Sequence, residues 1–159
     1  MSTLIQNEIA GDTHRKQARL NPRCVICGAE NPNGLHLHFN IDHSGAHADW
    51  MPTGQWESFE ETVHGGIVGA VLDEAMSKAV IARDWEVLTA ELTVRFRHRI
   101  APGEQLQVHG WVVEKRRGHI KAEALVEGGG EERAHAWGTF LVPARNSRGD
   151  RDITERQLI

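Results

Sequence analysis

The longest element that the hydrophobic pattern predicts is a helix from Ile67 to Ile81. Apolar or small residues occupy nearly every side of this segment, which is typical of a helix surrounded by protein rather than laid on a surface. Asp73 lies in the middle of it. Because a lone carboxylate is seldom buried without a reason, Asp73 is a candidate functional residue.

Alternating apolar and polar residues predict strands on both sides of this helix. Before it, Leu35 to Ile41 alternate, and Ala46 to Met51 follow as the return strand of a hairpin. After it, we expect four strands separated by glycine- or proline-containing turns, at residues 88–96, 106–113, 120–126 and 134–142. Short connections favour antiparallel neighbours, so we expect an α+β fold with one antiparallel sheet wrapped around the long central helix.

The length and composition narrow the class of protein. The chain has 159 residues, enough for one domain of ordinary size, and a net charge of −4 with a pI near 6.2. This charge gives no overall attraction to nucleic acid or to an anionic membrane. No apolar stretch approaches the ~20 residues of a membrane span, and no signal-peptide core precedes the domain, so we expect a cytoplasmic protein.

The pattern divides the chain into three parts. We expect an N-terminal arm over residues 1–22, the folded domain over 23–143 and a flexible, structureless tail over 144–159. The tail contains Arg148-Gly149-Asp150, which resembles an adhesion tripeptide. A cytosolic protein has no use for one, and we interpret it as coincidence.

A possible anion-binding turn precedes the helix at His64-Gly65-Gly66. Amides in the first turn of a helix have no intrahelical acceptor, and glycines let a ligand approach them closely. Such a turn can hold the oxyanion that develops when a thioester carbonyl is attacked. Two glycines that merely allow tight helix packing explain the motif equally well.

The acidic pair Asp73-Glu74 separates into two roles. No cation lies three or four residues from Asp73, so burial should raise its pKa and suit it to accept a proton or to attack a carbonyl. The alternative is a carboxylate satisfied by a backbone amide. Glu74 has Lys78 four residues on, which predicts an ordinary surface ion pair. Thr89, on the polar face of the next strand, could position a water molecule.

Two further groups of residues have weaker signals. Cys24 and Cys27 have the spacing of half a zinc site, for which the remaining ligands would be histidines such as His36, His38, His43 or His47. We take a structural turn as the default and expect no metal. Arg95 and Arg97 form part of a basic run that suits either the phosphates of a large cofactor or a solvated face.

Several segments together resemble the hotdog-fold thioesterases of the PaaI-like type. They are VHGGIVGAVLDEAM (63–76), TAELTVRF (89–96), the turn at Pro102-Gly103, CVICG (24–28) with NPNGL (31–35), and AWGTF (136–140). The resemblance implies that the Gly65 amide polarises the thioester carbonyl, that His64 helps to hold it, that Asp73 is the catalytic carboxylate and that Thr89 orients the water. It also implies dimers or tetramers, in which Gly65 of one subunit faces Asp73 of another.

We therefore expect an acyl-CoA or acyl-carrier thioester hydrolase that uses no cofactor, coenzyme A being part of the substrate. Catalysis is assigned to Asp73, Gly65, His64 and Thr89, and substrate binding to Gly66, Arg95 and Arg97. Three alternatives remain at this point: a noncatalytic acyl-ligand binder, a hotdog dehydratase or hydratase, and a zinc-ribbon interaction module. Nucleic acid and membrane are not expected partners.

Overall fold

The computed structural model describes residues 21–83, 87–116, 118–142, 144–145 and 151–152. One long helix, α1 (Gly65–Ile81), and a short 3-10 helix, η1 (Gly54–Trp56), occur in these residues. The strands are β1 (Asn40–Asp42), β2 (Gly45–Trp50), β3 (Glu57–Phe59), β4 (Thr62–Val63), β5 (Leu88–Phe96), β6 (Leu106–Arg116), β7 (His119–Gly128), β8 (Glu131–Leu141), β9 (Ala144–Arg145) and β10 (Arg151–Asp152). None of the described helices is both long and apolar enough to cross a bilayer.

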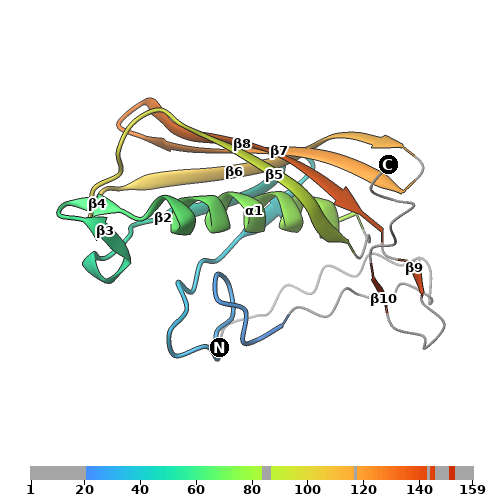
Figure 1. Cartoon of the computed structure of the whole chain (residues 1–159), viewed down its shortest axis with the longest axis horizontal. Coiled ribbons are helices and arrows are strands. Elements are labelled where there is room, and N and C mark those ends of the chain that lie inside the picture. The colour runs from blue at the N-terminus through green and yellow to red at the C-terminus, as the bar shows by residue number, and fades with distance from the viewer. Residues whose placement is uncertain (1–20, 84–86, 117, 143, 146–150, 153–159) are drawn as a thin grey trace, which may run out of the picture.

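The main sheet has six strands in the order β1-β2-β6-β7-β8-β5, and every neighbouring pair is antiparallel. The sheet curves over α1, which lies against one of its faces (Figure 1). The helix packs mainly against β6 and β7 and also contacts β2, β8 and β5. The predicted α+β arrangement is therefore confirmed, and the predicted boundaries of the central helix are correct to within two residues.

The core lies between α1 and the sheet. The largest fully buried side chains include Leu72 and Met76 of the helix and Phe140 and Ile120 of the sheet. Burial of several such side chains, each contributing about 1.5–3 kcal/mol, makes the helix–sheet layer the main source of stability.

Gly110 on β6 allows the helix to approach the sheet closely. A Cβ at this position would collide with the Ala75 carbonyl and lie 2.9 Å from the Met76 amide nitrogen. Both are backbone atoms of α1, which cannot rotate away as a flexible side chain can. The absence of a side chain at Gly110 therefore sets the spacing between α1 and β6.

We expect Gly110→Ala to lower the free energy of unfolding by about 3 kcal/mol, at the upper end of the usual overpacking penalty, because the helix backbone itself must move. Gly54→Ala is the matched control, since a Cβ there meets nothing within 4 Å. Urea unfolding of both variants measures the difference. Equal stabilities would show that α1 accommodates the methyl group freely.

A β-bulge in β5 changes which residues face the helix. The register with β8 shifts between Thr89 and Glu91, so that Thr89 lies opposite Phe140 while Leu92 lies opposite Gly138. Opposite residues of paired strands share a face of the sheet, and the extra residue of a bulge reverses the alternation. Thr89 consequently shares the helix-side face with Leu92. Its predicted position on the polar face is wrong, because strict alternation cannot account for a bulge.

The segment before α1 forms a hairpin that the pattern did not predict. Strands β3 and β4 pair with each other, and their residues are too few and too exposed to show alternation. The hairpin region is tied to the rest of the fold at the helix start: the His64 amide donates to Trp56 O (2.8 Å) and the Val63 amide to Ile100 O (2.9 Å). These bonds fix where the helix begins.

The predicted strand over residues 35–41 is wrong for most of its length, because only residues 40–42 are in β1. His36 has a positive φ of 53°, which interrupts an extended backbone. The amides of Leu35 and Leu37 instead donate to Val25 O and Ile26 O, at 2.9 and 2.8 Å. This segment therefore pairs with the cysteine-containing turn rather than with β2.

The terminal predictions are tested only in part. Residues 1–20 and the tripeptide at 148–150 lie outside the described residues. The prediction of a structureless tail is wrong for residues 144–145 and 151–152, which pair as antiparallel strands through their backbones. The domain boundaries at 23 and 143 stay a prediction.

Candidate active site

Asp73 and Thr89 meet between the third turn of α1 and the first residues of β5. Thr89 Oγ1 donates a hydrogen bond of 2.9 Å to Asp73 Oδ1, and both side chains are partly buried. The contact depends on the bulge, which turns Thr89 toward the helix. The second carboxylate oxygen of Asp73 accepts no hydrogen bond from any side chain in the described residues.

Burial raises the pKa of Asp73 above its ordinary value, and the negative charge of Glu74 raises it further, while the hydrogen bond from Thr89 opposes both effects. The direction agrees with the prediction made from the lack of a neighbouring cation. A carboxylate with a raised pKa is a better proton acceptor than an exposed one. The environment of Asp73 therefore suits general-base chemistry.

The start of α1 leaves one backbone amide available. His64 is the N-cap residue, and its Nδ1 accepts a hydrogen bond of 2.8 Å from the Gly66 amide. Since Nδ1 is an acceptor, a neutral His64 carries its proton on Nε2 and can donate from there. The Gly65 amide, by contrast, donates to no acceptor in the described residues. An unpaired amide at a helix N-terminus can bind an oxyanion.

This arrangement gives the two glycines different roles. A Cβ at Gly66 would lie 3.0 Å from His64 Nδ1, so the missing side chain makes room for the capping imidazole. A Cβ at Gly65 would lie 3.3 Å from the ring of Phe96 on β5. The Gly66 amide is engaged within the chain, and only Gly65 presents an amide to a ligand.

Within one chain, Gly65 and Asp73 are too far apart to act on one carbonyl group. Eight residues of helix separate them, or about 12 Å along the axis at ~1.5 Å per residue. Asp73 and Thr89 form one half of a site, and His64 and Gly65 form the other. The structure brings together the members of each half but does not bring the halves together in one chain.

The long edge strand β5 has an apolar, unpartnered side. It lies at the end of the sheet, and Leu92 and Phe96, which share its helix-side face, are 39% and 54% exposed. A long exposed edge with apolar side chains is a surface that proteins normally cover or pair. The same strand carries Thr89, which bonds to Asp73, and Phe96, whose ring lies against Gly65.

The two arginines that were candidates for substrate binding lie elsewhere. Arg95 pairs in register with His135, on the face of the sheet opposite to Asp73, and its guanidinium lies 5.9 Å from the centre of the Trp137 ring. Arg97 forms an ion pair with Glu132 at 3.1 Å. The structure therefore does not bring either arginine to Asp73, and their role in substrate binding stays a prediction.

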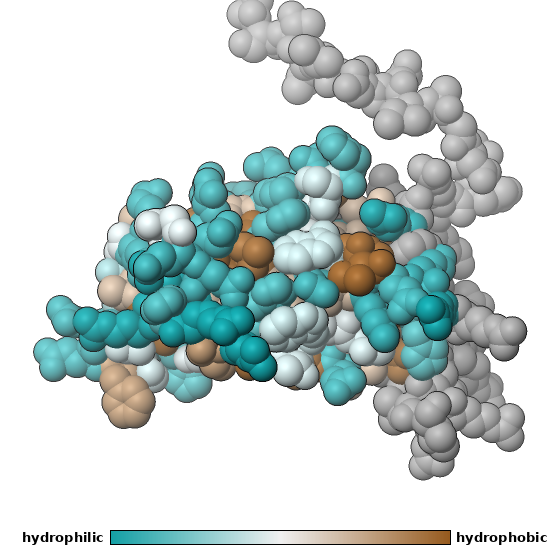
Figure 2. Space-filling view, turned by 90° about the horizontal axis from the view of Figure 1, so that it is seen from above, coloured by the Kyte–Doolittle hydropathy of each residue, from teal (hydrophilic) through white to brown (hydrophobic). Residues whose placement is uncertain are grey.

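The outer face of the sheet carries a row of rings. Figure 2 shows this face, on which hydrophilic and pale side chains predominate. His47 stacks on His109 with 4.1 Å between ring centres, and His135 stacks on Trp137 at 4.4 Å. Trp111 lies between the two stacks. The row crosses the sheet on the side away from α1 and contributes nothing to the Asp73 site.

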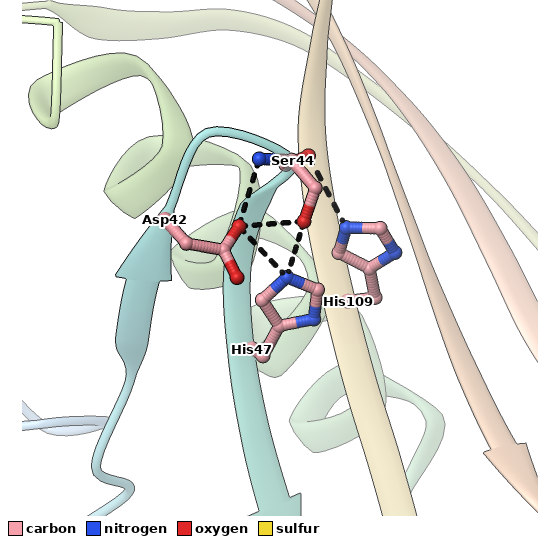
Figure 3. Close-up of polar contacts among 4 residues, drawn as sticks. All are labelled: Asp42, Ser44, His47 and His109. Carbon is pink, nitrogen blue, oxygen red and sulfur yellow. Dashed lines mark hydrogen bonds and ion pairs between the residues drawn. The ribbon is translucent and has the colours of Figure 1, made fainter.

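A second polar cluster lies at the turn between β1 and β2 (Figure 3). Asp42 Oδ1 accepts hydrogen bonds from the Ser44 amide (2.7 Å) and hydroxyl (2.6 Å), and these bonds lower the pKa of Asp42 to about 2. His47 Nε2 lies 2.9 Å from Ser44 Oγ and 3.5 Å from Asp42 Oδ1. In a catalytic triad, the carboxylate instead holds the imidazole nitrogen remote from the serine. The cluster stabilises an exposed turn and is not a nucleophile site.

Glu74 occupies a different environment from the one predicted. Its ion pair with Lys78 exists, at 3.3 Å between Oε1 and Nζ, but Lys78 is buried rather than on the surface. Glu74 Oε2 also lies 3.7 Å from Cys24 Sγ. None of the histidines considered as metal ligands joins this group in the described residues; the carboxylate of Glu74 lies there instead. No sequence signal linked Glu74 to cysteines fifty residues away, because only the fold makes them neighbours.

Comparison with known proteins relates the central part of the chain to one family. Residues 60–134 match the model of the thioesterase superfamily. None of the curated proteins matches the chain. Among solved structures, protein RHA08564 of the thioesterase superfamily has a TM-score of 0.70 at 19% identity, over 76% of this chain and 62% of its own length.

Two other structures extend the likeness. The PaaI protein of the phenylacetic acid degradation operon of E. coli has a TM-score of 0.64 at 16% identity, over 67% of this chain and 83% of its own. Zebra fish thioesterase superfamily member 2 has a TM-score of 0.65 at 16% identity, over 76% and 92%. At these identities the likeness shows the fold. Residues 60–134 therefore match the thioesterase superfamily, and the fold is the hotdog fold.

Proposed function

We propose that this protein hydrolyses acyl-CoA or acyl-carrier thioesters to a carboxylic acid and a free thiol. The observation that carries the proposal is the hydrogen bond between Thr89 and Asp73, a partly buried carboxylate whose pKa is raised by burial. Family membership supports thioester hydrolysis in general. The contact between Thr89 and Asp73 supports the roles of Asp73 as the base and of Thr89 as the residue that orients the water.

In the proposed reaction, Asp73 accepts a proton from a water molecule. Thr89 donates a hydrogen bond to Oδ1. Oδ2 of Asp73 and the lone pairs of the Thr89 hydroxyl are then left to accept hydrogen bonds from the water and orient it. The water oxygen attacks the thioester carbonyl carbon, the C–S bond then breaks, and the leaving thiolate takes up the proton. No metal takes part in these steps.

The carbonyl oxygen needs a donor that Asp73 and Thr89 do not provide, and in the proposal the Gly65 amide of a second copy supplies it. The apolar edge strand β5 lies beside both half-sites and is unpaired in one chain. Pairing of two such edges covers Leu92 and Phe96 and lets each chain complete the other's site. The active form is then at least a homodimer with two composite sites.

A panel of acyl-CoA thioesters tests this proposal, with release of free thiol as the readout. We expect turnover of at least one member. We expect Thr89→Val to lower kcat on the order of 10-fold, since a hydrogen bond to a charged group contributes about 1.5–3 kcal/mol. Because that bond holds the pKa of Asp73 down, its loss should also shift the acid limb of the kcat/KM profile to higher pH.

Thr93→Val is the matched control, because Thr93 lies opposite Trp137 on the outer face of β5. It should leave kcat and the pH profile as in the wild type. Identical profiles for the two variants would remove Thr89 from the mechanism. Binding of acyl-CoA without any product release would instead support a noncatalytic acyl-ligand binder.

A further inference from the structure

We propose that Cys24, Cys27 and Glu74 form a binding site for a thiophilic divalent metal ion of the zinc class. This site is separate from the proposed catalytic chemistry and does not depend on it. One potential ligand atom from each residue lies within 4.8 Å of the others. The set joins the turn at residues 24–28 to the central helix.

The turn holds both cysteines toward the helix. The Gly28 amide donates to Cys24 O (3.0 Å), and the Ile26 amide points to Cys24 Sγ at 3.4 Å. A Cβ at Gly28 would lie 2.7 Å from Cys24 O, so only glycine allows a turn this tight. An amide directed at a sulfur also stabilises a metal-bound thiolate. The backbone therefore prearranges two sulfur ligands on one side of the turn.

The third ligand comes from α1. Glu74 Oε2 lies 3.7 Å from Cys24 Sγ. With zinc–sulfur bonds of about 2.3 Å and zinc–oxygen bonds of about 2.1 Å, ligand atoms of a tetrahedral site are roughly 3.5–3.8 Å apart. The three atoms need to close from separations within 4.8 Å, that is by up to about 1.3 Å, which side-chain rotation can supply. A water molecule can complete the coordination sphere.

Charge favours an ion at this position. Two thiolates and one carboxylate carry three negative charges, and a divalent ion leaves one of them uncompensated. Buried Lys78, whose Nζ lies 3.3 Å from Glu74 Oε1, supplies the matching positive charge. Thiolate ligands select zinc over magnesium or calcium, which prefer oxygen. Cys24 and Cys27 each release one proton when the ion binds.

Metal content and cobalt substitution test the site directly. We expect the full-length protein, purified under reducing conditions with zinc present, to hold one zinc per chain and to lose thermal stability when a chelator removes it. Cobalt added to the metal-free protein should give sulfur-to-cobalt charge-transfer absorption. Because the chain contains only two cysteines, this absorption reports Cys24 and Cys27 alone.

Variants separate the ligands from their surroundings. Cys24→Ser and Cys27→Ser should each abolish stoichiometric zinc binding, and Glu74→Gln should weaken it at least 10-fold. Glu30→Gln, at an exposed carboxylate near the same turn, is the matched control and should bind zinc as the wild type does. Absence of the charge-transfer band in the wild type would overturn the proposal. Equal zinc affinity for Glu74→Gln and Glu30→Gln would overturn the role of Glu74.

Discussion

Replacing Asp73 with Asn is expected to lower kcat/KM for thioester hydrolysis by about 1,000-fold, within the 10²–10⁴ range that general bases contribute. The amide has nearly the shape of the carboxylate, so the substrate pocket is preserved, but it cannot accept a proton from water. Asp49→Asn is the matched control, since Asp49 is exposed on β2. Steady-state kinetics on the best substrate of the panel measures both variants.

The same substitution should change the response of stability to pH. Burial raises the pKa of Asp73 in the folded protein above its unfolded value, so the folded state holds more protons between these two pKa values. Its contribution to the free energy of unfolding therefore falls as pH rises through that window and stays low above it. Asp73→Asn should remove this decline, as measured by urea unfolding across the acidic range. Full hydrolytic activity in Asp73→Asn would exclude Asp73 as the base.

Replacing Gly65 with Pro is expected to lower kcat by about 100- to 1,000-fold, the usual cost of losing one oxyanion donor. Proline lacks the N–H that Gly65 presents, yet it is well tolerated as the first residue of a helix. The preceding His64 already has φ −60° and ψ 128°, values that a residue before proline adopts readily. The variant therefore removes the proposed donor while keeping the helix.

Gly65→Ala separates loss of the amide from crowding. Alanine keeps the N–H, and its Cβ only presses on the half-exposed Phe96 ring at 3.3 Å. We expect a much smaller loss of kcat than for proline, with circular dichroism confirming the helix in both variants. Equal losses in the two variants would assign the effect to packing at Phe96 rather than to the amide.

The composite site adds a complementation test. Asp73→Asn and Gly65→Pro dimers are each expected to keep only a small fraction of the activity, but a mixed dimer has one site with an intact Asp73 from one chain and an intact Gly65 amide from the other. Co-expression of the two should restore part of the wild-type activity, and light scattering should show at least a dimer. A fully active monomer would contradict the arrangement proposed for β5.

The sequence predicted the fold to a large extent because its central elements have strong periodic patterns. The all-round apolar character of residues 67–81 predicted the buried helix, and alternation predicted β5, β6, β7 and β8. The two half-sites were also visible as residues, since His64 and Gly65 begin the helix and Asp73 is the isolated acid within it. These features are local, so a linear pattern is enough to find them.

Other features depended on contacts between distant segments. The turn at Cys24 captures residues 35–37 by backbone hydrogen bonds, which local alternation could not predict. Glu74 appeared to be half of a surface pair until the fold placed it beside two cysteines in a buried environment. Arg95 and Arg97 looked suited to phosphate binding, but the pleat of the sheet directs Arg95 toward Trp137 and the side chain of Arg97 pairs with Glu132.

The sequence by itself determined the helix, the antiparallel strands and the identity of the proposed catalytic groups, because hydrophobic period and residue chemistry are properties of short segments. Only the tertiary structure decided that Thr89 faces Asp73, through one extra residue in β5, and that Glu74 lies beside Cys24 and Cys27. A side chain's direction depends on strand pairing, and contacts between segments far apart in the chain depend on packing. A local sequence pattern contains neither kind of information.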